Sequence, residues 1–147
     1  LGVQNVSFVA QAVDWIPESL FQIVTAAFRH RGFSFVRVLQ RCPEFVGNMY
    51  EQWVHDPQRM LMLTHEDGVQ VSPALQKIYR NQQAHDPSDI HRAREIASSE
   101  DPIPVGILYR NPEVPCYEDL RRAGLLRTAG SIRTSLEAEF DKFTVWP

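Results

Sequence analysis

Residues 5–39 read NVSFVAQAVDWIPESLFQIVTAAFRHRGFSFVRVL, and this stretch decides the fold. Its two ends, residues 5–10 and 33–39, are rich in β-branched and aromatic residues, which is typical of β-strands. Between them, Pro17 and Glu18 suit the first turn of a helix. The apolar residues of that helix recur at three- and four-residue spacing along one face: Leu20, Ile23, Val24, Ala27 and Phe28. A strand, a helix and a strand in so short a span predict a parallel βαβ unit with a right-handed crossover.

The following residues are predicted to extend this unit into one α/β domain over residues 1–112. Residues 40–73 contain several prolines, glycines and aromatic residues, and we expect an irregular excursion that acts as a lid or binds a partner. A helix is expected from Asp86 to about Ala97. Residues 103–109, IPVGILY, are expected to add a strand to a parallel sheet with helices on both faces.

Residues 113–147 are predicted to form a C-terminal extension. Apolar residues at four-residue spacing give a narrow stripe on a helix over residues 131–143: Ile132, Leu136 and Phe140. Together with Trp146, this stripe suits packing on a partner protein. We therefore expect that deleting residues 125–147 weakens subunit association and leaves the fold of residues 1–110 unchanged.

The composition excludes several classes of protein. The net charge of −3 and the absence of a Lys/Arg stripe argue against nucleic acid as a partner. No apolar run approaches the roughly 18–20 residues that cross a bilayer, and no secretory signal is recognisable. Two cysteines far apart in sequence give no disulfide framework, so a reducing cytoplasm is expected. The sequence starts at Leu1 instead of Met, which fits a fragment or a processed product.

Cys42 is the most informative single residue. It lies three residues beyond the predicted 33–39 strand, and Pro43 biases its backbone towards an extended conformation. In parallel α/β sheets functional groups gather just past the C-terminal ends of strands, so its thiol suits a metal-cluster ligand or a nucleophile. Free cysteine is also often a small buried hydrophobic residue, and position alone leaves these alternatives open. A cysteine hydrolase is disfavoured, because no nucleophile-elbow glycine pattern surrounds Cys42.

Three collinear stretches carry a resemblance to a known family. They are RHRGFSFVRVLQRCPEF at residues 29–45, VSFVAQAVDWIPESLFQIVTAAFRHRGF at residues 6–33, and HDPSD at residues 85–89 followed by IPVGILYRNPEVPCYEDL at residues 103–120. In order and spacing they resemble the C-terminal part of the thiamine-diphosphate-binding beta subunit of 2-oxoacid:ferredoxin oxidoreductases. The resemblance covers roughly residues 1–120. It implies the C-terminal portion of a thiamine-diphosphate-binding fold.

The resemblance assigns a role to Cys42. In this family a 4Fe–4S cluster beside the thiamine site takes three cysteine ligands from earlier in the subunit and a fourth from the cysteine at this position, so Cys42 is implied as a cofactor-binding metal ligand. The proline that usually precedes this cysteine is replaced by Arg41. A cation there favours the thiolate and tunes the cluster potential. Cys116 matches no cysteine of the pattern and is expected to be structural.

The resemblance also implies the reaction and the partners. The family performs CoA-dependent oxidative decarboxylation of a 2-oxoacid and passes electrons through the cluster to ferredoxin, with an alpha subunit as partner. We expect 2-oxoglutarate as substrate and pyruvate as the next choice. The family's G-D-G motif for Mg²⁺ and thiamine diphosphate, and the three other cysteines, do not occur in this sequence. Residues 1–147 would therefore be inactive alone and catalytic residues cannot be named, which leaves a non-catalytic α/β interaction fragment without cofactor as the alternative.

Other polar groups have simpler interpretations. His55-Asp56 and His85-Asp86 each precede a proline and are predicted to be turns or helix caps rather than catalytic groups. The run from His65 to Gly68 is a predicted solvated turn without metal-ligand spacing. The aromatic residues Trp15, Tyr50 and Trp53 are expected to pack or to lie at an interface. Asp14-Trp15 fits the family pattern least well, but follows the first strand and is expected near the cofactor side.

Overall fold

The computed structural model describes residues 1–2, 5–66, 69–122 and 129–143. It divides into two compact units, Leu1–Cys116 and Tyr117–Pro147, which we describe separately. In unit 1 the described strands are β1 (Phe8–Val13), β2 (Ser34–Leu39), β3 (Met60–Thr64), β4 (Gln82–Ala84) and β5 (Ile103–Arg110). Its helices are α1 (Pro17–Arg29), α2 (Glu51–His55), the short 3₁₀ helix η1 (Pro57–Arg59), α3 (Pro73–Ile78) and α4 (Ile90–Ala97).

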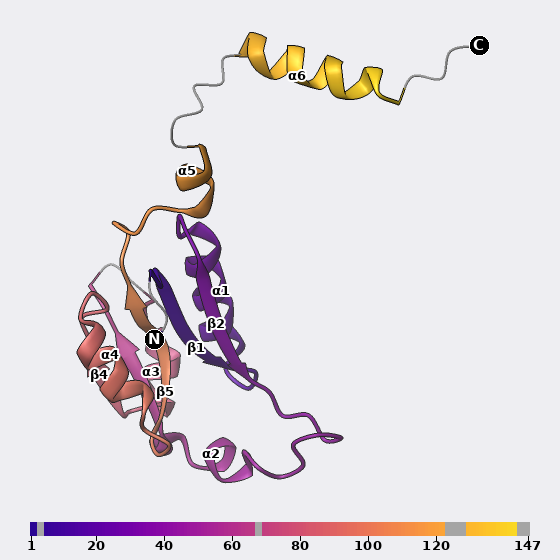
Figure 1. The fold of residues 1–147 in the computed structure, drawn as a ribbon. Helices are drawn as coiled ribbons and strands as arrows, with labels where there is room; N and C mark the ends of the chain where they lie inside the picture. The colour runs from indigo at the N-terminus through magenta and orange to yellow at the C-terminus, as the bar shows by residue number, and fades with distance from the viewer. Residues whose placement is uncertain (3–4, 67–68, 123–128, 144–147) are drawn as a thin grey trace. The chain divides into compact units, whose positions relative to one another are not determined.

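The predicted βαβ unit is confirmed. β1 pairs with β2 in parallel, from Phe8 opposite Ser34 to Val13 opposite Leu39, and α1 connects them (Figure 1). α1 begins at Pro17, where the missing N–H costs no helical hydrogen bond, and Glu18 lies in its first turn as expected. The first strand starts three residues later than the sequence indicated, because Asn5 adopts a positive φ of 59° in a turn.

The α/β class with flanking helices is confirmed, but the sheet is mixed, whereas we predicted a parallel one. The strand order is β2-β1-β5-β3-β4, and β5 runs antiparallel to β1 and parallel to β3. The reason lies in the connection between Leu39 and Met60. It contains only short helical pieces and no crossover helix. β3 therefore starts at the end of the sheet where β2 ended, and runs in the opposite direction to β2.

The segment predicted to be irregular also contributes to the core. Within residues 40–73 the run MLMLT forms β3, and the side chains of Met60, Met62 and Leu63 are buried. β4 is a further strand that the sequence did not indicate. A short continuous apolar run between turn signals can mark a buried strand, and residues 60–64 carried that signal.

Two apolar clusters lie on opposite faces of the sheet. Alternate residues of β1 point to opposite faces: Phe8 belongs to the cluster that contains Ile23 of α1, and Val9 to the cluster that contains Ala93 of α4. α1 and α4 therefore cover different faces. α4 begins four residues later than expected, because Asp89 is its N-cap and accepts hydrogen bonds from the backbone N–H groups of His91 (2.9 Å) and Arg92 (3.0 Å).

The centre of the sheet depends on one close approach. Gly106 of β5 has a φ of +141°, and a Cβ atom at this position would lie 2.8 Å from Cβ of Leu63 on neighbouring β3. The pairing of β5 with β1 also shifts register next to this point, between Val9 and Ala10. A residue without a side chain is therefore needed where β5 passes between its two neighbours.

β2 is an edge strand, and apolar side chains surround it. Phe35 is 52% exposed and Phe33 is 64% exposed, and on α1 Phe28 is 90% exposed. Among the described residues β2 pairs only with β1. Strands of parallel pairs are usually covered on both faces, so this side of unit 1 is incompletely covered.

Unit 2 contains α5 (Tyr117–Arg122) and α6 (Ala129–Asp141). The side chains of Ile132, Leu136 and Phe140 on α6 are exposed, as a helix with an interface stripe would require. Trp146 lies outside the described residues. The docking of this extension on a partner protein remains a prediction.

Candidate functional site at the Cys42 edge of the sheet

β1 and β2 end, and β3 and β5 begin, at the same end of the sheet. We call this end the Cys42 edge, which is distinct from the edge strand β2. Cys42 is a free, partly buried thiol in the turn after β2. Its backbone N–H donates to the carbonyl of Gln40 (3.1 Å), and its own carbonyl accepts from the N–H groups of Val46 (2.9 Å) and Gly47 (3.2 Å). The structure therefore places Cys42 past the ends of two parallel strands, as a site residue of an α/β sheet would be.

Asp14, at the end of β1, contacts the residue that precedes Cys42. Its carboxylate accepts the backbone N–H of Arg41 at 3.2 Å and Nε of Arg41 at 3.0 Å. The backbone N–H of Asp14 donates to the carbonyl of Leu39 at 3.0 Å, one step beyond the β1–β2 pairing. Asp14 therefore lies beside the segment that carries Cys42. Its expected place on the cofactor side stays a prediction.

A row of aromatic rings and guanidinium groups runs along the same edge. The Trp15 and Tyr50 rings lie 5.8 Å apart, and the Tyr50 and Trp53 rings lie 6.0 Å apart, measured between centroids. The guanidinium carbon of Arg41 lies 5.8 Å from the Trp15 ring centre, and that of Arg59 lies 5.2 Å from the Trp53 ring centre. These aromatic residues pack residues 40–59 against the sheet.

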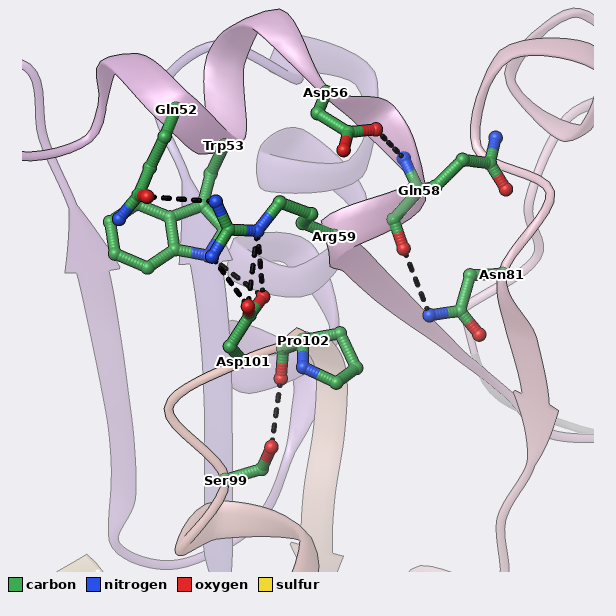
Figure 2. A network of polar contacts seen from close by, with 9 residues as sticks. All are labelled: Gln52, Trp53, Asp56, Gln58, Arg59, Asn81, Ser99, Asp101 and Pro102. Atoms are coloured by element: carbon green, nitrogen blue, oxygen red, sulfur yellow. Dashed lines mark hydrogen bonds and ion pairs between the residues drawn. The ribbon is translucent and has the colours of Figure 1, made fainter.

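Arg59 and Asp101 form an ion pair beside Trp53, the last aromatic residue of this row (Figure 2). Nε of Arg59 donates to both carboxylate oxygens of Asp101, at 3.0 and 3.1 Å, and Nη1 donates to the side chain of Gln52 at 2.7 Å. Nε1 of Trp53 donates to Asp101 at 3.3 Å. A forked, shared contact of this kind fixes geometry better than an isolated surface ion pair. No local sequence pattern indicated it, because 42 residues separate its two charged partners.

Asp101 makes a pH-dependent contribution to the stability of this edge. The hydrogen bond from Arg59 lowers the pKa of Asp101 below its ordinary 3.8, desolvation opposes this shift, and the bond from Trp53 adds to it. The folded protein therefore holds the ionised carboxylate more tightly than the unfolded chain. This contribution is complete above pH 3.8 and is lost as the pH falls through the lower folded pKa.

We predict that Asp101→Asn lowers the melting temperature by a few degrees at pH 7, and that the difference from the native protein shrinks as the pH falls below 3.8. Circular dichroism melts across this range measure it. Glu100→Gln is the matched control, since it removes the neighbouring exposed carboxylate and leaves the Arg59 contact intact. An Asp101→Asn effect that is the same at pH 7 and pH 3 would argue against an ionic contribution.

Two buried histidines lie at the opposite edge, after β3 and β4. A ring N–H at Nε2 of His85 donates to the carbonyl of Leu108 (2.7 Å), and a ring N–H at Nδ1 of His65 donates to the carbonyl of His85 (2.8 Å). These bonds connect the segments after β3 and β4 with each other and with β5, so both side chains stabilise the sheet. Asp86 accepts from N–H and O–H of Ser88, which is the predicted turn.

The remaining candidates are structural or lie outside the described residues. Asp56 caps η1 by accepting from the N–H of Gln58 at 3.1 Å, and His55 is exposed beside Glu51. Asp67 and Gly68 of the predicted turn are among the residues that the structure does not describe. Cys116 is a free, partly buried thiol at the end of unit 1.

Cys42 fits an iron–sulfur cluster as one ligand and no more. Its thiolate is the required donor type, and it is not engaged in a disulfide. In the part of the chain that the structure describes, no group of three or more His, Cys, Asp or Glu side chains could hold a metal ion. The described helices also include none that is long and apolar enough to span a membrane.

Comparison with known proteins supports the resemblance drawn from the sequence. Residues 75–123 match the family model that describes the C-terminal region of the beta subunit of pyruvate ferredoxin oxidoreductase. The chain is 26% identical over 113 residues (77% of its length) to "2-oxoacid:ferredoxin oxidoreductase 2, subunit beta" of Aeropyrum pernix. It is 26% identical over 122 residues (80% of its length) to the beta subunit of a 2-oxoacid:ferredoxin oxidoreductase from a Sulfolobus species. These matches span 34% and 36% of the two relatives, about a third of their length. The chain is thus similar, over most of its own length, to one part of the beta subunits of 2-oxoacid:ferredoxin oxidoreductases.

Proposed function

We propose that this chain is part of the beta subunit of a 2-oxoacid:ferredoxin oxidoreductase, and that Cys42 is one of four thiolate ligands of its 4Fe–4S cluster. One observation carries the proposal: the only cysteine that matches the family pattern lies past the ends of β1 and β2, where cofactors collect in parallel α/β units. The overall likeness to two beta subunits supports it.

The residues of this chain would hold and shield the cluster. The Cys42 thiolate would bind one iron, and the row from Trp15 to Trp53 would keep residues 40–59 over the edge and limit access of water. When bound, thiamine diphosphate accepts the electrons released by decarboxylation, and the cluster transfers them singly. Mg²⁺ and the diphosphate would be held by parts of the subunit beyond this sequence, because the family's G-D-G motif is not among these residues.

The proposed reaction is CoA-dependent oxidative decarboxylation, with 2-oxoglutarate as the first substrate candidate and pyruvate as the second. This order rests on overall likeness to the two-subunit enzymes rather than on a pocket residue. The proposed partners are the alpha subunit of the same enzyme and ferredoxin.

A non-catalytic α/β interaction fragment is the second candidate. Two observations favour it: these residues contain one cysteine that matches the family pattern and no G-D-G motif, and apolar side chains are exposed on α1 and β2. Such a fragment would bind a partner through these surfaces and would carry no cofactor.

The test is to purify the protein anaerobically with the subunits that accompany it, and to measure ferredoxin reduction. Reduction that requires both CoA and a 2-oxoacid supports the enzyme, and the ratio of kcat/KM for 2-oxoglutarate and pyruvate gives the substrate. Iron, thiamine and magnesium analyses of the same sample test the cofactors. A stable, correctly folded sample without iron, thiamine or 2-oxoacid-dependent reduction would establish the non-catalytic alternative.

A further inference from the structure

We propose that Asp14 is a positioning residue for Cys42, and that its bond to the backbone of Arg41 restrains residue 41 as a proline at that position would. The proposal rests on the proposed function, since it concerns how the cluster ligand is held. It starts from one observation. The Asp14 carboxylate bonds both the backbone N–H and the side chain of Arg41, the residue that precedes Cys42.

The contact acts on the backbone as well as on the side chain. A proline fixes φ and carries no N–H, whereas Arg41 has a free φ and an added N–H donor. The Asp14 carboxylate accepts a hydrogen bond from that N–H at 3.2 Å. The second carboxylate oxygen takes Nε of Arg41 at 3.0 Å, so the carboxylate holds residue 41 at two points.

The position of Cys42 follows from that anchor. On one side of the thiol, Asp14 holds Arg41 and also donates its own N–H to Leu39. On the other side, the Cys42 carbonyl accepts two backbone N–H groups. Pro43 restricts the backbone of Cys42 further. The rotation about the Cα–Cβ bond of Cys42 is then the main freedom left to the sulfur.

The two residues that follow Pro43 are not held by apolar packing. Phe45 is 92% exposed, and Glu44 is exposed as well. The Asp14 side chain, by contrast, is only 27% exposed, so its hydrogen bonds are partly shielded from competing water. Polar contacts therefore help to hold this segment, and Asp14 provides the side-chain contacts to the residue next to Cys42.

The experiment compares four variants in the assembled protein: Asp14→Ala, Arg41→Pro, the double variant, and Arg41→Gln. Two quantities are measured: amide hydrogen exchange of residues 41–47, and the half-life of protein-bound iron in the presence of a chelator. Asp14→Ala should raise exchange by roughly tenfold and shorten the iron half-life, because it frees the backbone of residue 41. Arg41→Pro should show nearly native amide exchange and iron half-life. In the double variant, proline at position 41 should bring both quantities most of the way back from their Asp14→Ala values.

Arg41→Gln separates the backbone bond from the ion pair. It keeps the N–H that Asp14 accepts and removes the guanidinium group, so we expect a much smaller effect than that of Asp14→Ala. Native exchange and native iron retention in Asp14→Ala would overturn the proposal. A double variant no better than Asp14→Ala would also overturn it, since the carboxylate would then not stand in for proline. If the native protein binds no iron while the exchange pattern holds, the assignment of the cluster fails and the role of Asp14 in positioning the Cys42 turn remains.

Discussion

Under the proposed function, replacing Cys42 with alanine should strip the assembled protein of most of its iron and abolish the broad visible absorption that thiolate-to-iron bands give at roughly 400 nm. Loss of an outer contact to a metal ligand typically costs about 10–100-fold in metal affinity or activity, and loss of the ligand itself should cost at least as much. Ferredoxin reduction should therefore fall by about 100-fold or more. Thiamine content should change little, because the diphosphate is proposed to be held elsewhere.

Cys116→Ala is the matched control, since Cys116 is the second free, partly buried thiol of the chain. This variant should retain its iron, its absorption and its turnover. Iron analysis, visible spectra and a ferredoxin reduction assay on both variants give the comparison. If Cys42→Ala keeps full iron content and ferredoxin-linked turnover, Cys42 is a packed thiol and the proposed site loses its central residue.

A second large effect is expected from Gly106→Ala at the centre of the sheet. The new Cβ would lie 2.8 Å from Cβ of Leu63 and 3.1 Å from its carbonyl oxygen, and the φ of +141° is one that alanine rarely adopts. Backbone strain and overpacking each cost about 1–3 kcal/mol. We therefore expect the free energy of unfolding to fall by about 2–6 kcal/mol, which is a large share of the stability of a typical domain.

Urea denaturation followed by circular dichroism measures this change. Gly2→Ala is the control, because nothing lies within 4 Å of its new Cβ. A Gly106→Ala variant as stable as Gly2→Ala would show that β3 and β5 can move apart, and that the close approach is not needed for the fold.

Local patterns predicted the parts of the fold that local forces determine. The stripe on α1 and its first-turn proline identified that helix, and the β-branched runs beside it identified the parallel pair β1 and β2. The direction of β5 could not be read in this way, because it depends on where the connection from Leu39 to Met60 returns to the sheet. β4 was missed because QQA contains no apolar pattern, and two of its three side chains are exposed.

The candidate site divides in the same manner. Cys42 and its place beyond a strand end could be predicted, because both depend on residues close in sequence. The contacts of Asp14 with Arg41 and of His85 with Leu108 join residues 27 and 23 positions apart, and no local pattern indicates them. The turn at Asp86 was therefore predicted, whereas the burial of the His85 ring and its bond to β5 were not.

The open edge of β2 has a practical consequence for anyone who prepares this chain alone. Among the described strands only β1 pairs with it, so its outer backbone groups and the exposed rings of Phe33 and Phe35 form a template on which a strand of another molecule can add. Light scattering should then rise with protein concentration and with salt, which screens the repulsion between molecules of net charge −3. The substitution Phe35→Lys would place a gatekeeper charge on this edge, keep concentrated samples clear, and leave the Cys42 edge untouched.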